Sequence, residues 1–73
     1  MIKKQVGFRI REIRNSKQLS QEECALSVGL DRTYWSSVER GLRNISIVNL
    51  NKICSFFDIP LKDFFDSDFF REK

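Results

Sequence analysis

Residues 20–41 contain two helix-start signals, and the short helix between them ends in residues that favour a tight turn. Ser20 and Glu23 have the spacing of a capping box, in which the hydroxyl and the carboxylate accept the free backbone N–H groups of a helix start. Gly29 suits the left-handed backbone that ends a helix, and Asp31 is a good N-cap for the next one. The run therefore predicts two short helices joined by a tight turn, the geometry of a helix-turn-helix over about 20–40.

The rest of the chain also has helical periodicity. Apolar residues recur at Val6, Ile10 and Ile13, which predicts an amphipathic first helix. Behind a Ser46 cap, one apolar stripe is formed by Ile47, Leu50, Ile53, Cys54 and Phe57. Pro60 suits the first position of a further helix, and no segment alternates as a strand would. We therefore expect an all-α fold of five helices, at about 2–17, 21–27, 32–40, 47–57 and 60–65.

Length and composition limit the class of protein. The 73 residues suffice for one domain, and 41% hydrophobic with 32% charged residues indicates a globular chain. No apolar run approaches the ~20 residues that cross a bilayer, and residues 1–4 have no signal-peptide core. We therefore expect a cytoplasmic protein that has no membrane contact.

The residues that usually carry catalysis or metal binding are scarce. The chain has no histidine, no glycine-rich phosphate loop and no carboxylate pair in an evident pocket, so we expect no enzyme activity and no cofactor. Its two cysteines, Cys24 and Cys54, are too few for a zinc site within one chain. Both lie at helical apolar positions, so we expect reduced thiols in the core.

The second helix of the central run has a polar face suited to DNA. If Trp35 and Val38 point inward, the opposite face carries Arg32, Thr33, Ser36 and Ser37. Arginine can pair with guanine through two hydrogen bonds, and serine or threonine can contact several bases. Charge agrees with this, since residues 1–44 hold nine Lys/Arg against five Asp/Glu, while residues 45–73 hold four against five. The pattern favours a helix that enters the DNA major groove.

Two sets of residues resemble known regulators. The first resembles the Cro/CI-type, XRE-like helix-turn-helix family and reads Ser20-Gln21-Glu22-x-x-Ala25, Gly29-Leu30 and Glu39-Arg40-Gly41. The second is similar to controller proteins of restriction–modification systems and reads Leu30-Asp31-Arg32-Thr33-Tyr34 and Glu39-Arg40-Gly41-x-Arg43-Asn44-x-Ser46. The resemblance spans about 6–65 and implies a lambda-repressor-like domain. Controller proteins are small dimers that bind operators beside their own gene, and phage repressors of the Cro/CI type share much of the same run.

The resemblance also implies a role for individual residues. It implies that the bases are read by Arg32, Thr33, Ser36 and Ser37. It also implies contacts to the DNA backbone or minor groove from Gln21, Tyr34, Arg43, Asn44 and Asn49. Arg14 and Glu39 match a partly buried ion pair between the first and third helices. The chain departs from the usual family residues at four positions: Cys24, Trp35, Asn51 and Phe56.

Phenylalanine is concentrated near the C-terminus, at Phe56, Phe57, Phe64, Phe65, Phe69 and Phe70. A domain this small can bury about three of these rings, and Phe57, Phe64 and Phe65 are the best placed. Exposed apolar patches usually mark contact surfaces, so we expect a twofold homodimer through helices at about 46–70. Its interface residues would be Phe56, Phe65, Phe69 and Phe70. The alternative is a monomeric core with a disordered tail at Phe69 and Phe70. Residues 66–73 are consistent with either a frayed tail or a last helical turn.

These patterns together predict a homodimeric transcriptional regulator that binds an inverted repeat in double-stranded DNA near its own promoter. It would activate, repress or do both, and RNA polymerase is a further candidate partner. A competing hypothesis is an antitoxin or another protein-interaction module that uses its apolar C-terminal patch.

Overall fold

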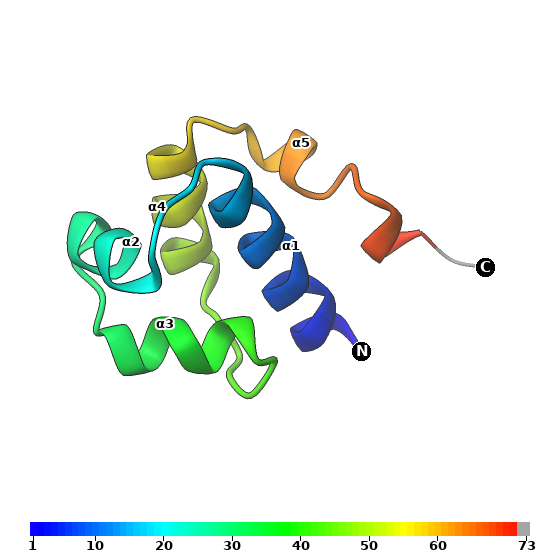
Figure 1. The fold of residues 1–73 in the computed structure, drawn as a ribbon. Coiled ribbons are helices and arrows are strands. Elements are labelled where there is room, and N and C mark those ends of the chain that lie inside the picture. The colour runs from blue at the N-terminus through cyan, green and yellow to red at the C-terminus, as the bar shows by residue number, and fades with distance from the viewer. Residues whose placement is uncertain (72–73) are drawn as a thin grey trace.

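The computed structural model describes residues 1–71, which form the expected all-α fold without a strand (Figure 1). Its elements are α1 (Ile2–Ser16), α2 (Gln21–Val28), α3 (Arg32–Glu39), α4 (Ile47–Phe57), α5 (Leu61–Phe64) and the 3₁₀ turn η1 (Asp68–Phe70). The five predicted helices are thus confirmed to within one or two residues at their ends. None of the helices in the described range is long and apolar enough to cross a membrane.

Local capping chemistry determines where these helices begin. The Ser20 hydroxyl and the Glu23 carboxylate each accept the other residue's backbone N–H, so the predicted capping box is confirmed. The Ser46 hydroxyl caps α4 by accepting the backbone N–H of Asn49. Pro60 differs from the prediction, because it is the N-cap of α5 with an extended ψ of 150° rather than the first helical residue. The fixed ring is tolerated at either position, since neither needs a backbone N–H.

The core lies between α1, α3 and α4. Val6, Ile10 and Ile13 of α1 are buried as predicted, and they pack with Trp35 and Phe57. Cys24 and Cys54 are also buried and form no disulfide, and burial raises the pKa of both thiols. The prediction that both cysteines lie in the core is therefore confirmed.

Gly7 brings the backbones of α1 and α3 together, a contact that the sequence patterns did not predict. A Cβ atom on Gly7 would lie 2.5 Å from the carbonyl oxygen of Val38 and 2.6 Å from that of Glu39. These distances are far below van der Waals contact, so a side chain at position 7 would push the two helices apart.

The C-terminal segment folds back onto α1. Arg9 donates from Nε to the carbonyl oxygen of Phe64 at 2.7 Å and from Nη2 to that of Asp63 at 2.8 Å. The side-chain amide of Gln5 donates to the carbonyl oxygen of Phe69, whose ring lies 5.7 Å from that of Phe8. A frayed tail is therefore wrong for residues 68–71, and the last turn is the correct alternative. Residues 72–73 lie outside the described range.

Two apolar residues expected in the core are exposed instead. Phe65 was expected to be buried with Phe57 and Phe64, but it is 41% exposed because α5 ends there and Phe64 alone turns inward. Ile47 was expected to belong to the buried stripe of α4, but it is 80% exposed at the first position of that helix. The C-terminal patch is thus smaller than predicted, since Phe56, Phe69 and Phe70 are half-buried within the chain itself.

Candidate DNA-binding surface

The central run folds into two crossing helices, with α2 beside the N-terminal part of α3 (Figure 1). Gly29 ends α2 in the left-handed conformation, with φ 75°, and Leu30 donates its backbone N–H to the carbonyl oxygen of Ala25 at 2.9 Å. Ala25 is fully buried where the two helices meet. Asp31 then caps α3 by accepting the backbone N–H groups of Thr33 and Tyr34. The predicted helix-turn-helix is confirmed.

The side of α3 that faces away from the core is polar. Trp35 and Val38 are buried, as predicted. Arg32 and Thr33 are exposed in the first turn of α3, whereas Ser36 and Ser37 are half-buried one turn later. The hydrogen-bonding side chains of this face are therefore most exposed at the N-terminal end of α3. This is the part of a recognition helix that usually contacts base edges.

A buried carboxylate holds α3 against its neighbours. Glu39 Oε2 accepts from Trp35 Nε1 and from Arg14 Nε, each at 2.6 Å. Oε1 accepts from Arg14 Nη2 and from Gln21 Nε2, each at 3.0 Å, and Arg11 Nε lies 3.5 Å away. The predicted ion pair between α1 and α3 is present, and it belongs to a wider network that also includes α2.

This network keeps Glu39 ionised. Burial alone would raise the pKa of this carboxyl, but hydrogen bonds from Arg14, Gln21 and Trp35 and the charge of Arg14 outweigh it, so the pKa is lowered. The bonds to Glu39 in turn raise the pKa of Arg14. The side-chain amide of Gln21 uses one of its two N–H donors here, which leaves the second one available. Gln21 also begins α2, where backbone N–H groups have no partner inside the helix.

Trp35 is accommodated by a bond that the sequence analysis missed. Trp35 is one of the four departures from the family that the chain resembles, and its large ring fits because its N–H reaches Glu39 one helical turn later. The ring also meets Phe57 edge-on, with centroids 6.2 Å apart. The four-residue spacing of Trp35 and Glu39 is the sequence signal that could have predicted the bond.

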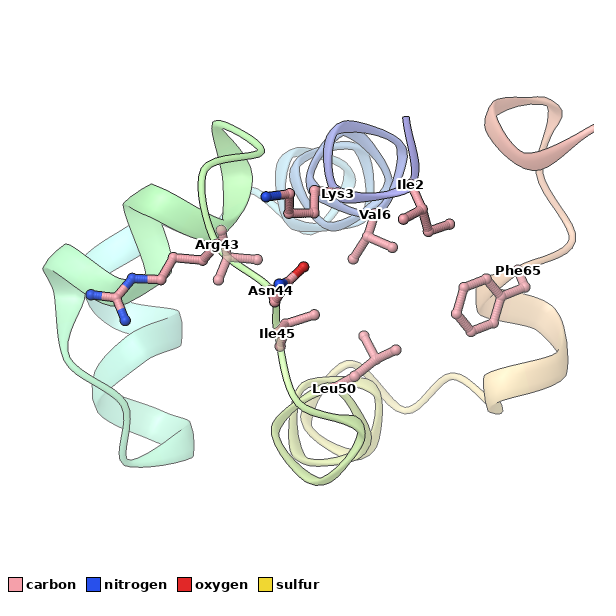
Figure 2. A pocket seen from close by; sticks show the side chains of 9 residues that line it. Ile2, Lys3, Val6, Arg43, Asn44, Ile45, Leu50 and Phe65 are labelled. Atoms are coloured by element: carbon pink, nitrogen blue, oxygen red, sulfur yellow. The ribbon is translucent and has the colours of Figure 1, made fainter.

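A second polar group lies where α3, α4 and the loop between them meet. Asn49 donates from its side chain to the Tyr34 hydroxyl oxygen at 3.2 Å, and the Arg43 guanidinium lies 5.2 Å from the centre of the Tyr34 ring. Arg43 and its neighbour Asn44 are exposed. Figure 2 shows the Arg43 side chain extending from the loop towards α3. The structure thus gathers Tyr34, Arg43 and Asn49 beside the polar face of α3.

The geometry defines a helix-turn-helix protein, and the comparisons with known proteins agree. A family model described as helix-turn-helix matches residues 10–64. Control protein C.MunI from Mycoplasma sp is 46% identical over 72 residues, which cover 97% of this chain and 96% of that protein. Control protein C.BamHI from Bacillus amyloliquefaciens is 44% identical over 61 residues, covering 82% of this chain and 75% of that one.

Solved structures give the same result. The restriction–modification controller protein C.AhdI from Aeromonas hydrophila matches with a TM-score of 0.81 and 47% identity, over 85% of this chain and 94% of that one. The C.Esp1396I tetramer in complex with its natural 35 base-pair operator matches with a TM-score of 0.84 and 36% identity, over 90% and 87% of the two chains. This chain therefore belongs to the helix-turn-helix family and, within it, to the controller proteins of restriction–modification systems. These proteins are DNA-binding transcriptional regulators.

Proposed function

We propose that this chain is a cytoplasmic, non-enzymatic regulator that binds an inverted-repeat operator near its own promoter as a homodimer. The observation that carries the proposal is the polar face of α3, which presents Arg32 and Thr33 to solvent while the buried Glu39 network holds the helix in place. The operator complex of the relative C.Esp1396I supports it, since that protein shares the fold of this chain.

In this proposal the exposed face of α3 reads the bases. Arg32 grips guanine O6 and N7 with two hydrogen bonds, and Thr33 contacts an adjacent base or a thymine methyl. Ser36 and Ser37 approach the flanking bases, where their half-buried hydroxyls have a shorter reach. Sequence preference is therefore strongest at the base pair that Arg32 contacts.

The surrounding groups hold the DNA backbone. Gln21 meets a phosphate with its second side-chain N–H and with the N-terminus of α2. Since the Tyr34 hydroxyl accepts from Asn49, its own hydrogen is directed elsewhere and can donate to a phosphate oxygen. Arg43 and Asn44 contact the minor groove or its phosphates from the loop.

Residues 1–73 would act as one DNA-binding unit that dimerises through the helices at about 46–70. A twofold axis there sets two copies of α3 about one DNA turn apart, ~34 Å. The interface would include Phe65 and the edges of the half-buried Phe56, Phe69 and Phe70. Because dimerisation and operator binding are linked, occupancy rises steeply with protein concentration. The resulting switch would activate or repress, and activation would add a contact with RNA polymerase.

Footprinting on the DNA upstream of the protein's own gene tests this function. Across a range of protein concentrations at moderate salt, we expect twofold-symmetric protection of two half-sites. Arg32→Ala should relax the sequence preference at one base pair. Lys17→Ala is a charge-matched control at the end of α1, outside the helix-turn-helix and the helices at about 46–70, and it should leave the protection unchanged. An absence of any footprint on this DNA would overturn the proposal.

A further inference from the structure

Two arginines of α1 face the buried carboxylate of Glu39, and it holds them very differently. The side chain of Arg14 is 13% exposed, and each of its three nitrogen atoms donates a hydrogen bond, two of them to Glu39 and one to the carbonyl oxygen of Leu19. The side chain of Arg11 is 46% exposed, and its Nε lies 3.5 Å from Glu39 Oε1. This distance is longer than the ~2.7–3.2 Å of a normal N–H···O bond. Arg14 is therefore fixed by Glu39, whereas Arg11 is held only weakly.

The positive charge of Arg11 is not balanced within residues 1–71. The single negative charge of Glu39 already faces Arg14 at 2.6 Å, so the three side chains keep a net charge of +1. Glu22 and Glu23 lie in the first turn of α2, but neither forms an ion pair with Arg11 in this part of the chain. In the same range, neither Nη atom of Arg11 has a hydrogen-bond partner. These two groups form the fork with which arginine binds two oxygens of a phosphate.

The contact with Glu39 places this guanidinium next to Gln21. The side-chain amide of Gln21 donates to Glu39 Oε1 at 3.0 Å, and this is the same oxygen that Arg11 Nε approaches. In the proposed function, the second N–H of Gln21 meets a DNA phosphate. Because both side chains meet at one oxygen atom, a phosphate that Gln21 binds also lies within reach of the Arg11 fork. Arg11 is not among the backbone contacts that the resemblance implies.

We propose that Arg11 is a further DNA-backbone contact, and that its guanidinium turns from Glu39 to the phosphate bound by Gln21. This inference rests on the proposed function and adds α1 to the elements that hold the DNA. Loss of the long contact with Arg11 leaves Glu39 with the four hydrogen bonds from Arg14, Gln21 and Trp35. In exchange, Arg11 gains charge-assisted bonds, which are about twice as strong as neutral ones.

Matched alanine variants at two basic residues of α1 test the contact. Arg11→Ala removes the fork, whereas Lys17→Ala removes the same charge at the end of α1 and on another side of the helix, since six positions do not make whole turns. Operator titrations at several salt concentrations should show Arg11→Ala lowering the log–log salt slope by ~1 for each occupied half-site. At moderate salt, binding should weaken on the order of tenfold, to the same extent on the operator and on its single-base variants. Lys17→Ala should leave the slope unchanged, because a charge that meets no phosphate releases no counterion.

Two further measurements separate a DNA contact from a structural role through Glu39. The midpoint of urea unfolding should be the same in Arg11→Ala as in the unaltered chain, because Glu39 keeps its ion pair with Arg14. Arg11→Lys should keep most of the salt slope, since lysine also binds phosphate as a point charge. A lowered midpoint with an unchanged slope in Arg11→Ala would assign Arg11 to the fold alone and overturn the proposal.

The remaining outcomes distinguish this contact from the function on which it rests. Equal changes of slope in Arg11→Ala and Lys17→Ala would reveal an effect of overall charge and overturn the contact. An unchanged slope in Arg11→Ala with an intact footprint would also overturn the contact, and it would leave the proposed function in place. An absence of any footprint by the unaltered chain would overturn the proposed function and this inference with it.

Discussion

Replacing Glu39 with glutamine should remove a large part of the stability of this domain. The side chain keeps its size, but it loses the charge that faces Arg14, whose side chain is only 13% exposed. Each carboxylate oxygen of Glu39 accepts two of the hydrogen bonds described above. In glutamine one of these oxygens is replaced by an NH₂ group, so two N–H donors would face another donor. Breaking a buried ion pair costs ~3–5 kcal/mol, and the residual exposure of Arg14 favours the lower end, about 3 kcal/mol.

The matched control for this change is Glu12→Gln. Glu12 pairs with Arg9 at 2.8 Å but is 53% exposed, so the same loss of charge should cost at most about 0.5 kcal/mol. Urea unfolding followed by tryptophan fluorescence measures both variants, since Trp35 is the only tryptophan and is fully buried. The protein concentration must be held constant, because dimerisation adds to apparent stability. A loss below about 1 kcal/mol in Glu39→Gln, or a loss equal to that in Glu12→Gln, would refute the reasoning.

Four further outcomes are expected. Arg32→Ala should weaken operator binding by ~1–3 kcal/mol and relax specificity at one base pair, as measured by competition with single-base operator variants. Arg43→Ala should weaken binding evenly across sequences and, where it neutralises one phosphate, lower the log–log salt slope by ~1 in titrations at several salt concentrations. Because the pKa of the Glu39 carboxyl is lowered by folding, the ionised carboxylate stabilises the fold at pH values above the usual pKa near 4.5, and this stability is lost as the pH falls through the lower folded-state pKa. Acid titration should therefore show that the free energy of unfolding depends less on pH in Glu39→Gln than in the unaltered protein. Gly7→Ala should destabilise the fold despite its higher helix propensity, and an unchanged midpoint of urea unfolding would contradict the close approach of α1 and α3.

The helix boundaries could be predicted because their causes are local. Capping by Ser20, Asp31 and Ser46 depends on residues two or three positions away, and each capping bond appears in the structure. The left-handed turn at Gly29 follows from the same local chemistry. The positions of Trp35 and Val38 in the core follow from helical spacing once α3 has been placed. The polar face of α3 could therefore be predicted from the sequence.

The missed features depend on contacts between distant segments. Periodicity assigns Ile47 to the buried stripe of α4, but it cannot show that no element within residues 1–71 covers that end of the helix. The need for glycine at position 7 arises from the carbonyl groups of α3, which are about 30 residues away. Likewise, the bond from Gln21 to Glu39 exists only because α1, α2 and α3 converge on one carboxylate.

The contacts that anchor the C-terminal segment to α1 have a consequence for synthesis of the chain. Gln5 and Arg9 leave the ribosome well before their bonding partners, which are Phe69, Phe64 and Asp63. Residues 21–39 leave the ribosome before residues 63–69 do, so the two crossing helices can pack before those partners emerge. The contact of the Phe8 ring with Phe69 and that of the Phe65 ring with Phe70 can form only after residues 69 and 70 have emerged. Each new molecule can thus form its helix-turn-helix first, and it docks its C-terminal segment onto α1 last.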